Sequence, residues 1–304
     1  MSSNSLHECL NAAEFCRQFE ARTGKSVQQV IDLIIPTTAD KAVFLVGSLP
    51  LGMATQGSDV DFIVLIDDGA NLSASQSNGA TNTTQRLAFY NDNDPLRAGE
   101  FLSVINGVTV DVTVAIASAV KRVHDRLRSR GPQLTDNEIM TLSRLSTGWL
   151  MLQTEEFLQR NAVQAADPAL DVHCSTVRFV SALGFRQKAL KSVDLMDIPL
   201  ALHLGRSSVE MAYLAYFASE GFSYLGAKWL AQIGRARGAA DRVRRHPLLA
   251  QGVQLLFPAF TPEAEAATVY LQAVSDFLTS MRNLIEQKLL FRIAFKTCPL
   301  IQPI

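Results

Sequence analysis

The segment from Val46 to Leu65 constrains the fold of this 304-residue chain most, because it places two acids within an otherwise apolar run. It reads VGSLPLGMATQGSDVDFIVL, and Asp59 and Asp61 alternate with Val60 and Phe62. Residues two apart on a strand share a face, so the pattern predicts a strand whose apolar side chains enter a core and whose carboxylates lie side by side. Their repulsion calls for a cation, and Mg²⁺ typically binds one or two protein carboxylates together with phosphate oxygens.

A third acid lies in a later run that also alternates. Val108–Ile116 reads VTVDVTVAI, which predicts a strand with valines on one face and Thr109, Asp111 and Thr113 on the other. If the two strands are neighbours, Asp111 joins the first two acids, and three carboxylates can hold two metal ions about 3.5 to 4 Å apart, as in phosphoryl or nucleotidyl transfer. The alternative interpretation is that Asp59 caps a turn and the other two acids are exposed strand residues.

Gly47 and Ser48 directly follow the apolar strand-like run 42–46. A glycine at that point lets the backbone approach an anion closely, and the N–H groups of the following turn and the Ser48 hydroxyl can hold phosphate. The sequence therefore predicts a phosphate cradle that faces the acids.

The order of these features resembles the DNA polymerase beta-type nucleotidyltransferases over residues 41–116. A strand, Gly-Ser, ten intervening residues, Asp-x-Asp in a second strand and a lone Asp in a third strand make up the shared pattern. The resemblance implies that Gly47 and Ser48 hold a nucleoside triphosphate, with Ser58 of the SDVD segment beside it. It also implies that Asp59, Asp61 and Asp111 bind two Mg²⁺ ions, with Mn²⁺ as an alternative metal, and leaves open whether Asp111 is a metal ligand or a base.

A weaker similarity extends to Lys228-Trp229-Leu230, which matches a segment in the helical part of several small-molecule nucleotidyltransferases. The resemblance implies that Lys228 binds the triphosphate. The alternative is that Trp229 and Leu230 belong to a helical core and Lys228 is their solvated neighbour.

The overall pattern predicts an α+β protein in which a small mixed sheet with flanking helices is followed by an all-helical domain. After Gly131-Pro132 the periodicity becomes helical, so we expect a nucleotidyltransferase catalytic domain at 1–130 and a helical acceptor-binding domain at 131–304. Expected helices in the second part are 135–160, 172–192, 207–219, 224–236 and 261–295, and the polar stretch 69–85 is expected to be a loop.

Composition narrows the class of partner. A net charge of −1, from 28 Lys and Arg against 29 Asp and Glu, argues against a broad nucleic-acid surface. No apolar run reaches the roughly 18 to 20 residues of a membrane span, and the beginning of the chain has no secretory pattern, so we expect a cytoplasmic protein.

These observations favour transfer of a nucleoside monophosphate, with AMP from ATP expected, to a hydroxyl of a small-molecule acceptor with release of pyrophosphate. A second hypothesis is nucleotidylylation (AMPylation) of a partner protein, as in the antitoxin-like minimal nucleotidyltransferases. A third is a nucleotide-binding scaffold without turnover.

Overall fold

The structure is a computed structural model that describes residues 6, 9, 11–35, 40–55, 57–68, 84–88, 96–128, 134–153, 157, 168–223, 246–256 and 263–297, with only the backbone described at 84–88, 97 and 290–297. Contacts within the chain divide it into two compact units, Met1–Asp167 and Pro168–Ile304. We call them the sheet unit and the helical unit.

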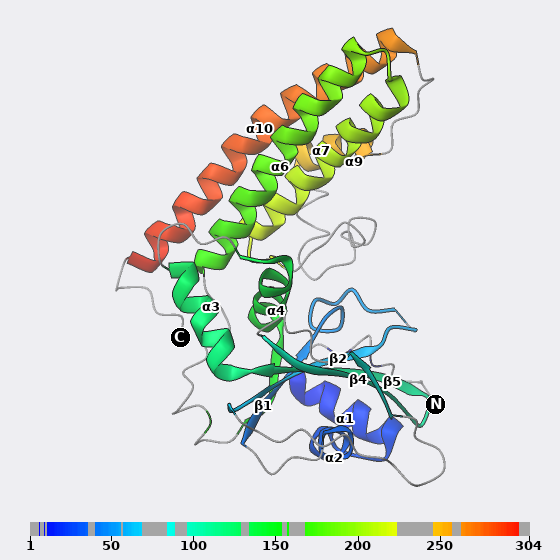
Figure 1. Ribbon diagram of the computed structural model, residues 1–304, viewed down its shortest axis with the longest axis vertical. Helices are drawn as coiled ribbons and strands as arrows, with labels where there is room; N and C mark the ends of the chain where they lie inside the picture. The colour runs from blue at the N-terminus through cyan, green and yellow to red at the C-terminus, as the bar shows by residue number, and fades with distance from the viewer. Residues whose placement is uncertain are drawn as a thin grey trace. The chain divides into compact units, whose positions relative to one another are not determined.

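A six-stranded mixed sheet forms the centre of the sheet unit, with the strand order β3-β4-β5-β2-β1-β6 (Figure 1). Only β2 and β5 run parallel, and the other neighbouring strands pair antiparallel. The predicted fold class, a mixed sheet with flanking helices followed by a helical region, is confirmed. The strands are β1 (Lys41–Val46), β2 (Val60–Ile66), β3 (Thr84–Ala88), β4 (Arg97–Ile105), β5 (Val108–Ile116) and β6 (Trp149–Gln153).

Two short helices precede the sheet, α1 (Ala12–Thr23) and α2 (Val27–Ile34). The Asn11 side chain caps α1 by accepting the backbone N–H of Glu14 at 2.9 Å. Gly24 ends the helix with φ +69°, a left-handed conformation that glycine adopts at little cost.

Aromatic rings hold α1 against the apolar face of β2. Phe15 and Phe19 lie edge-on to Phe62, with ring centroids 6.3 and 6.0 Å away, and all three side chains are fully buried. The alternating valines of β5 enter the same core. This face of the sheet is therefore closed, and polar side chains of β2 and β5 lie on the opposite face.

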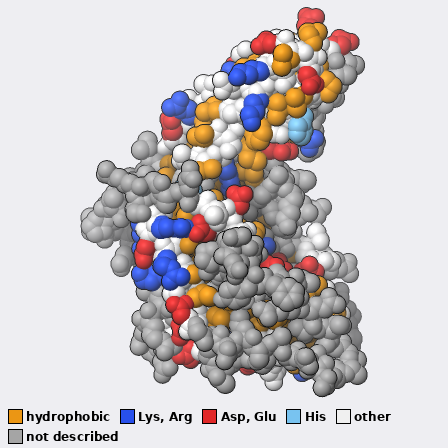
Figure 2. Space-filling view, viewed as in Figure 1, with side chains coloured by type: hydrophobic (Ala, Val, Ile, Leu, Met, Phe, Trp, Pro, Cys, Tyr) orange, Lys and Arg blue, Asp and Glu red, His pale blue; other side chains and the backbone are white. Residues whose placement is uncertain are grey.

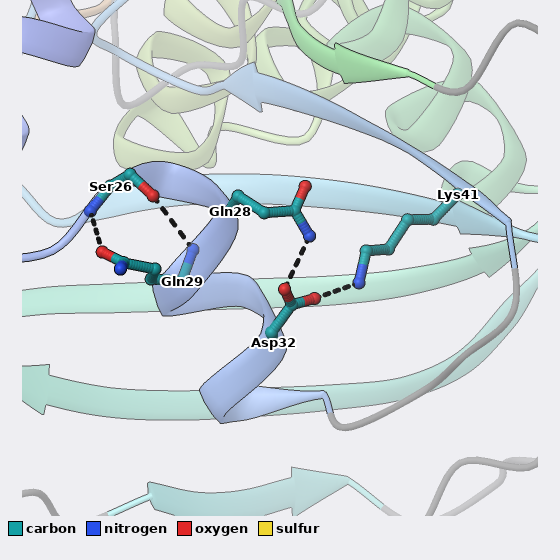
Figure 3. Close-up of polar contacts among 5 residues, drawn as sticks. All are labelled: Ser26, Gln28, Gln29, Asp32 and Lys41. Carbon is teal, nitrogen blue, oxygen red and sulfur yellow. Dashed lines mark hydrogen bonds and ion pairs between the residues drawn. The ribbon is translucent and has the colours of Figure 1, made fainter.

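Polar contacts fix α2 at its beginning and near its end (Figure 3). Ser26 and Gln29 form a reciprocal capping box in which each side chain accepts the other's backbone N–H. One turn from the end of the helix, Asp32 accepts hydrogen bonds from Gln28, at 2.7 Å, and from Lys41 at the beginning of β1. The helix is thereby tied to the first strand.

The chain from the polar stretch onward differs from its sequence prediction in three places. The strands β3 and β4 were not predicted, and β3 begins at Thr84, at the end of the expected loop 69–85, of which 69–83 lies outside the described residues. The expected helix 135–160 is wrong beyond Thr147: α4 (Asp136–Thr147) stops at Gly148, and β6 then pairs with β1. A Cβ on Gly148 would lie 2.9 Å from the backbone oxygen of Leu45, so only glycine allows this close turn onto β1. Because β6 belongs to the sheet, the sheet unit extends past the expected boundary near residue 131.

Four described helices make up the helical unit: α6 (Pro168–Asp194), α7 (Ile198–Ser219), α9 (Pro247–Leu256) and α10 (Ala264–Thr297). The expected helices 172–192 and 207–219 are confirmed, as is the range 261–295 from Ala264 onward, whereas 261–262 and 224–236 lie outside the described residues. Among the described helices, none is both long and apolar enough to cross a membrane.

Buried tyrosines and glycines bring the helices of this unit together. The Tyr213 and Tyr270 hydroxyls donate to backbone oxygens of α9, at Leu249 and, at 2.9 Å, at Leu255. Burial raises the pKa of Tyr270 to about 12, so its hydroxyl keeps its proton and remains a donor. Gly252 of α9 has no room for a Cβ, which would lie 2.7 Å from the Tyr213 hydroxyl oxygen.

Apolar side chains remain on the outside of the helical unit. Figure 2 shows hydrophobic side chains among charged ones along this part of the surface. On α6 they include Val177, Val180 and Leu183, which are 45%, 63% and 43% exposed. On α10 Val269, which is 67% exposed, occurs together with intrahelical charge pairs such as Arg282 with Glu286 at 2.8 Å.

Candidate active site

Asp61 and Asp111 lie directly opposite each other on the two parallel strands at the centre of the sheet. The register pairs Val60 with Val110 and Asp61 with Asp111. The two valines enter the core against α1 and α2, so the two carboxylates share the opposite face, and both residues are partly exposed. Neighbouring strands are about 4.8 Å apart, which places these two carboxylates side by side.

Gly47 brings the first turn into contact with Asp61. It follows β1 with φ +80°, and β1 pairs Val46 with Asp61. A Cβ on Gly47 would collide with Asp61 Oδ2 and lie 3.0 Å from its Cγ. Two physical requirements therefore demand glycine here, the left-handed backbone and the carboxylate that occupies the space of a side chain.

A backbone hydrogen bond and buried apolar side chains stabilise the turn that contains Gly47 and Ser48. The Met53 N–H donates to the Ser48 backbone oxygen at 2.9 Å, and Leu49, Leu51 and Met53 are buried. Ser48 itself is 4% exposed. The turn is thus anchored by its apolar side chains, which keeps the Gly-Ser backbone beside Asp61.

Asp59 lies two residues before Asp61 and is exposed. The neighbouring Ser58 closes a small loop: its hydroxyl accepts the Thr55 N–H at 2.8 Å, while its own N–H donates to the Thr55 oxygen at 3.0 Å. The residues of the described ranges contain no cluster of three or more His, Cys, Asp or Glu side chains placed to hold a metal ion. The structure thus brings Asp61 and Asp111 together. Asp59 lies two residues before Asp61, directly before β2.

A hollow of about 200 Å³ adjoins Asp59. Polar residues from three segments line it: Arg22 of α1, then Thr55, Ser58 and Asp59 of the loop before β2, and Thr109 of β5. Sequence analysis missed Arg22, because its position in α1 indicates only a solvent-facing residue in the last turn. It also missed the hollow, which exists only because the end of α1, the loop before β2 and the β4–β5 turn meet.

Residues 30–130, which contain the Gly-Ser turn and all three acids, match the sequence profile of the family described as "Nucleotidyltransferase domain". This chain contains a nucleotidyltransferase domain. The identification confirms the resemblance to the polymerase beta-type superfamily that the motif order predicted. The domain belongs to a family of transferases and lies within the sheet unit.

Other comparisons add one solved structure. No curated protein matches the chain significantly. Among the solved structures that match is a nucleotidyltransferase-like protein from Exiguobacterium sibiricum, which is 14% identical with a TM-score of 0.41, over 90% of this chain and 79% of that one.

The donor set of the nucleotidyltransferase domain suits a hard divalent cation. Asp61 and Asp111 present carboxylate oxygens from adjacent strands, and Mg²⁺ commonly takes only one or two protein carboxylates and fills its other positions with phosphate oxygens and water. The close contact between Gly47 and Asp61 places the Gly-Ser backbone beside this carboxylate. Lys228, the predicted triphosphate ligand, lies outside the described residues.

Proposed function

We propose that the nucleotidyltransferase domain moves a nucleoside monophosphate, expected to be AMP from ATP, to a hydroxyl of a small-molecule acceptor. One observation carries the proposal: Asp61 lies in register with Asp111 and also against the Cα of Gly47. The turn proposed to hold phosphate and a pair of carboxylates are thereby adjacent, which supports transfer of a phosphate-linked group.

The residues of the site divide the work as follows. The backbone of Gly47 and Ser48 would hold the triphosphate, with Ser58 and Lys228 as further proposed contacts. Asp59, Asp61 and Asp111 would hold Mg²⁺, or Mn²⁺ in its place, with room for two ions in the proposal. Bound there, the metal would supply charge neutralisation for the phosphates and lower the pKa of the acceptor hydroxyl.

The proposed reaction is an in-line displacement at the α-phosphorus. A bond forms between the acceptor oxygen and the α-phosphorus, the bond from the α-phosphorus to the bridging oxygen breaks, and pyrophosphate leaves with the electron pair. The hydroxyl proton would pass to a carboxylate oxygen of Asp111. The fixed strand register supplies positioning, which is the main contribution of a protein to such transfers.

The test is calorimetric binding of non-hydrolysable ATP, GTP, CTP and UTP analogues with and without Mg²⁺. We expect one nucleotide to bind in a metal-dependent manner and binding to be lost in Asp61→Asn and Asp111→Asn. The matched control is Asp68→Asn, at the other end of β2, where the carboxylate accepts a hydrogen bond from Ser118 Oγ at 2.7 Å. Equal binding by all variants, or none by the folded wild type, would overturn the proposal.

A further inference from the structure

The hollow beside Asp59 contains opposite charges that come from different elements. Arg22 is contributed by the last turn of α1 and Asp59 by the residue before β2, and the hydroxyl-bearing residues Thr55, Ser58 and Thr109 line the same space. Two glycines of its lining, Gly57 and Gly107, face open space: a Cβ on either would meet no heavy atom within 4 Å. The hollow is therefore polar and unobstructed at these two points.

The position of the hollow connects it with the proposed reaction centre. Asp59 and Thr109 precede the registered pair Val60–Val110, and Asp61–Asp111 is the next pair. Residues two apart on a strand are separated by about 7 Å along its direction. The hollow thus begins one such step from the carboxylate pair, and neither Gly47 nor Ser48 lines it.

Within the described ranges the Arg22 side chain forms neither an ion pair nor a hydrogen bond. Hydrogen bonds of the neighbouring residue fix the backbone at this end of α1. The neighbouring Thr23 donates its hydroxyl to Phe19 O at 2.7 Å, and the Thr23 oxygen accepts a hydrogen bond from Asn106 Nδ2 at 2.7 Å. This bond ties the end of α1 to the β4–β5 turn, so the backbone at Arg22 is fixed beside the hollow, and its exposed side chain can reach a ligand there.

We propose that this hollow binds the acceptor through a phosphate group carried by the acceptor, with Arg22 as its charged ligand. The inference rests on the proposed function and names its acceptor class as phosphorylated hydroxy compounds. A guanidinium together with hydroxyl donors matches the several acceptor oxygens of a phosphate. The volume of about 200 Å³ lies below the roughly 300 to 1,000 Å³ of sites for drug-sized ligands, which suits one end of a small acceptor and not a whole nucleotide.

The arrangement also gives the acceptor a direction. Its phosphate is held at Arg22, and its hydroxyl extends past Asp59 toward Asp61 and Asp111. Leu49 of the Gly-Ser turn borders the hollow, but neither Gly47 nor Ser48 lines it, so in the proposal the donor phosphates and the acceptor phosphate occupy neighbouring, separate places.

The experiment titrates inorganic phosphate into the full chain saturated with Mg²⁺ and a non-hydrolysable ATP analogue, so that the nucleotide site is already filled. We expect the wild type to bind phosphate in addition to the nucleotide. Arg22→Gln should weaken the Kd for phosphate about tenfold or more, since charge-assisted hydrogen bonds contribute about 1.5 to 3 kcal/mol. Gly57→Leu should weaken it similarly by filling the open space.

Arg17→Gln is the matched control, because Arg17 lies on the same helix and does not line the hollow. Its Kd for phosphate should stay within about twofold of the wild type. Circular dichroism checks that every variant is folded. Absence of phosphate binding to the wild type, or an unchanged Kd in Arg22→Gln, overturns the inference.

Failure of the proposed function would look different. In that case the ATP analogue itself fails to bind, and the phosphate titration repeated without nucleotide still tests the hollow through Arg22→Gln. If the analogue binds and phosphate does not, the proposed transfer function stands, and the proposed acceptor class of phosphorylated hydroxy compounds is wrong.

Discussion

Gly47 of the sheet unit and Gly252 of the helical unit both lie where a side chain would collide with a neighbour, yet the neighbours differ in kind. At Gly47 the obstacle is the carboxylate of Asp61, and the backbone has φ +80°. At Gly252 the obstacles are the rings of Tyr213 and Phe277, and the glycine lies inside the helix α9. The close contact at Gly47 positions the Asp61 carboxylate, whereas the close contact at Gly252 lets the core of the helical unit pack tightly.

This difference shows how the two units use the absence of a side chain. In the sheet unit a small displacement moves a carboxylate relative to its partner on the next strand, so activity should respond first. In the helical unit the same displacement moves apolar rings that only fill space, so stability should respond first. Substitutions at the two glycines can separate the two effects.

Gly47→Ala should give the largest effect. The new methyl group would displace Asp61, and a misplacement of about 1 Å in a transfer site costs on the order of 100-fold in rate. The left-handed backbone adds a stability loss of about 1 to 2 kcal/mol for any residue with a Cβ. The measurements are transfer rate and urea unfolding.

Gly57→Ala, where a Cβ meets open space, is the control and should change stability by less than about 0.5 kcal/mol. A Gly47→Ala enzyme with wild-type turnover would remove Gly47 from the site.

Gly252→Ala should lower stability and leave nucleotide binding unchanged. Its methyl group would press on Tyr213 and Phe277, and overpacking of a core costs about 1 to 3 kcal/mol. The free energy of unfolding should fall by that amount, while the Kd of the nucleotide analogue, corrected for the folded fraction, stays at the wild-type value. A nucleotide Kd that changes as much as in Gly47→Ala would show that the two close approaches are not different in kind.

Gly184→Ala tests the comparison from the other side, because this glycine of α6 has open space where a Cβ would be. Alanine in a helix interior is favoured over glycine by about 0.5 to 1 kcal/mol, so the variant should be more stable by up to that amount. Thermal unfolding measures the gain. A loss of stability would mean that the outer side of α6 contacts a part of the chain outside the described residues.

The same contrast explains what the sequence could predict. Strands β1, β2 and β5 were predictable because their apolar residues run or alternate without interruption. The strand β6 was not, since its apolar residues Trp149 to Leu152 continue the pattern of the preceding helix and only Gly148 marks the change. The strand β4 contains Gly99 and Glu100 near its beginning, which weaken its apolar pattern.

For the candidate site, alternation predicted which face Asp61 and Asp111 share, but not that they lie in register. That pairing depends on two strands, β3 and β4, that lie between them in the sequence and pair to the outer side of β5. The contact between Gly47 and Asp61 and the approach of Arg22 to Asp59 are likewise tertiary. Residue pattern alone gives the face of a side chain, whereas register and close contact require the assembled sheet.

Asp32 offers the smallest expected effect, because its contacts are polar and its side chain is 48% exposed. Burial raises its pKa, but the hydrogen bonds from Lys41 and Gln28 and the charge of Lys41 lower it more, so the net pKa lies below the ordinary value. The stability that this carboxylate contributes is therefore complete above about pH 4, the ordinary pKa, and is lost as the pH falls through the lower folded-state value.

After allowance for solvent screening, Asp32→Asn should cost about 0.5 kcal/mol at pH 7, and the difference from the wild type should shrink as the pH falls below the ordinary pKa of about 4. Urea unfolding across this pH range measures it, and the same substitution in a Lys41→Met background should show a smaller pH dependence, because only the hydrogen bond from Gln28 remains. An effect as large as that of Gly252→Ala would mean that this exposed contact fixes α2 as strongly as a core contact does.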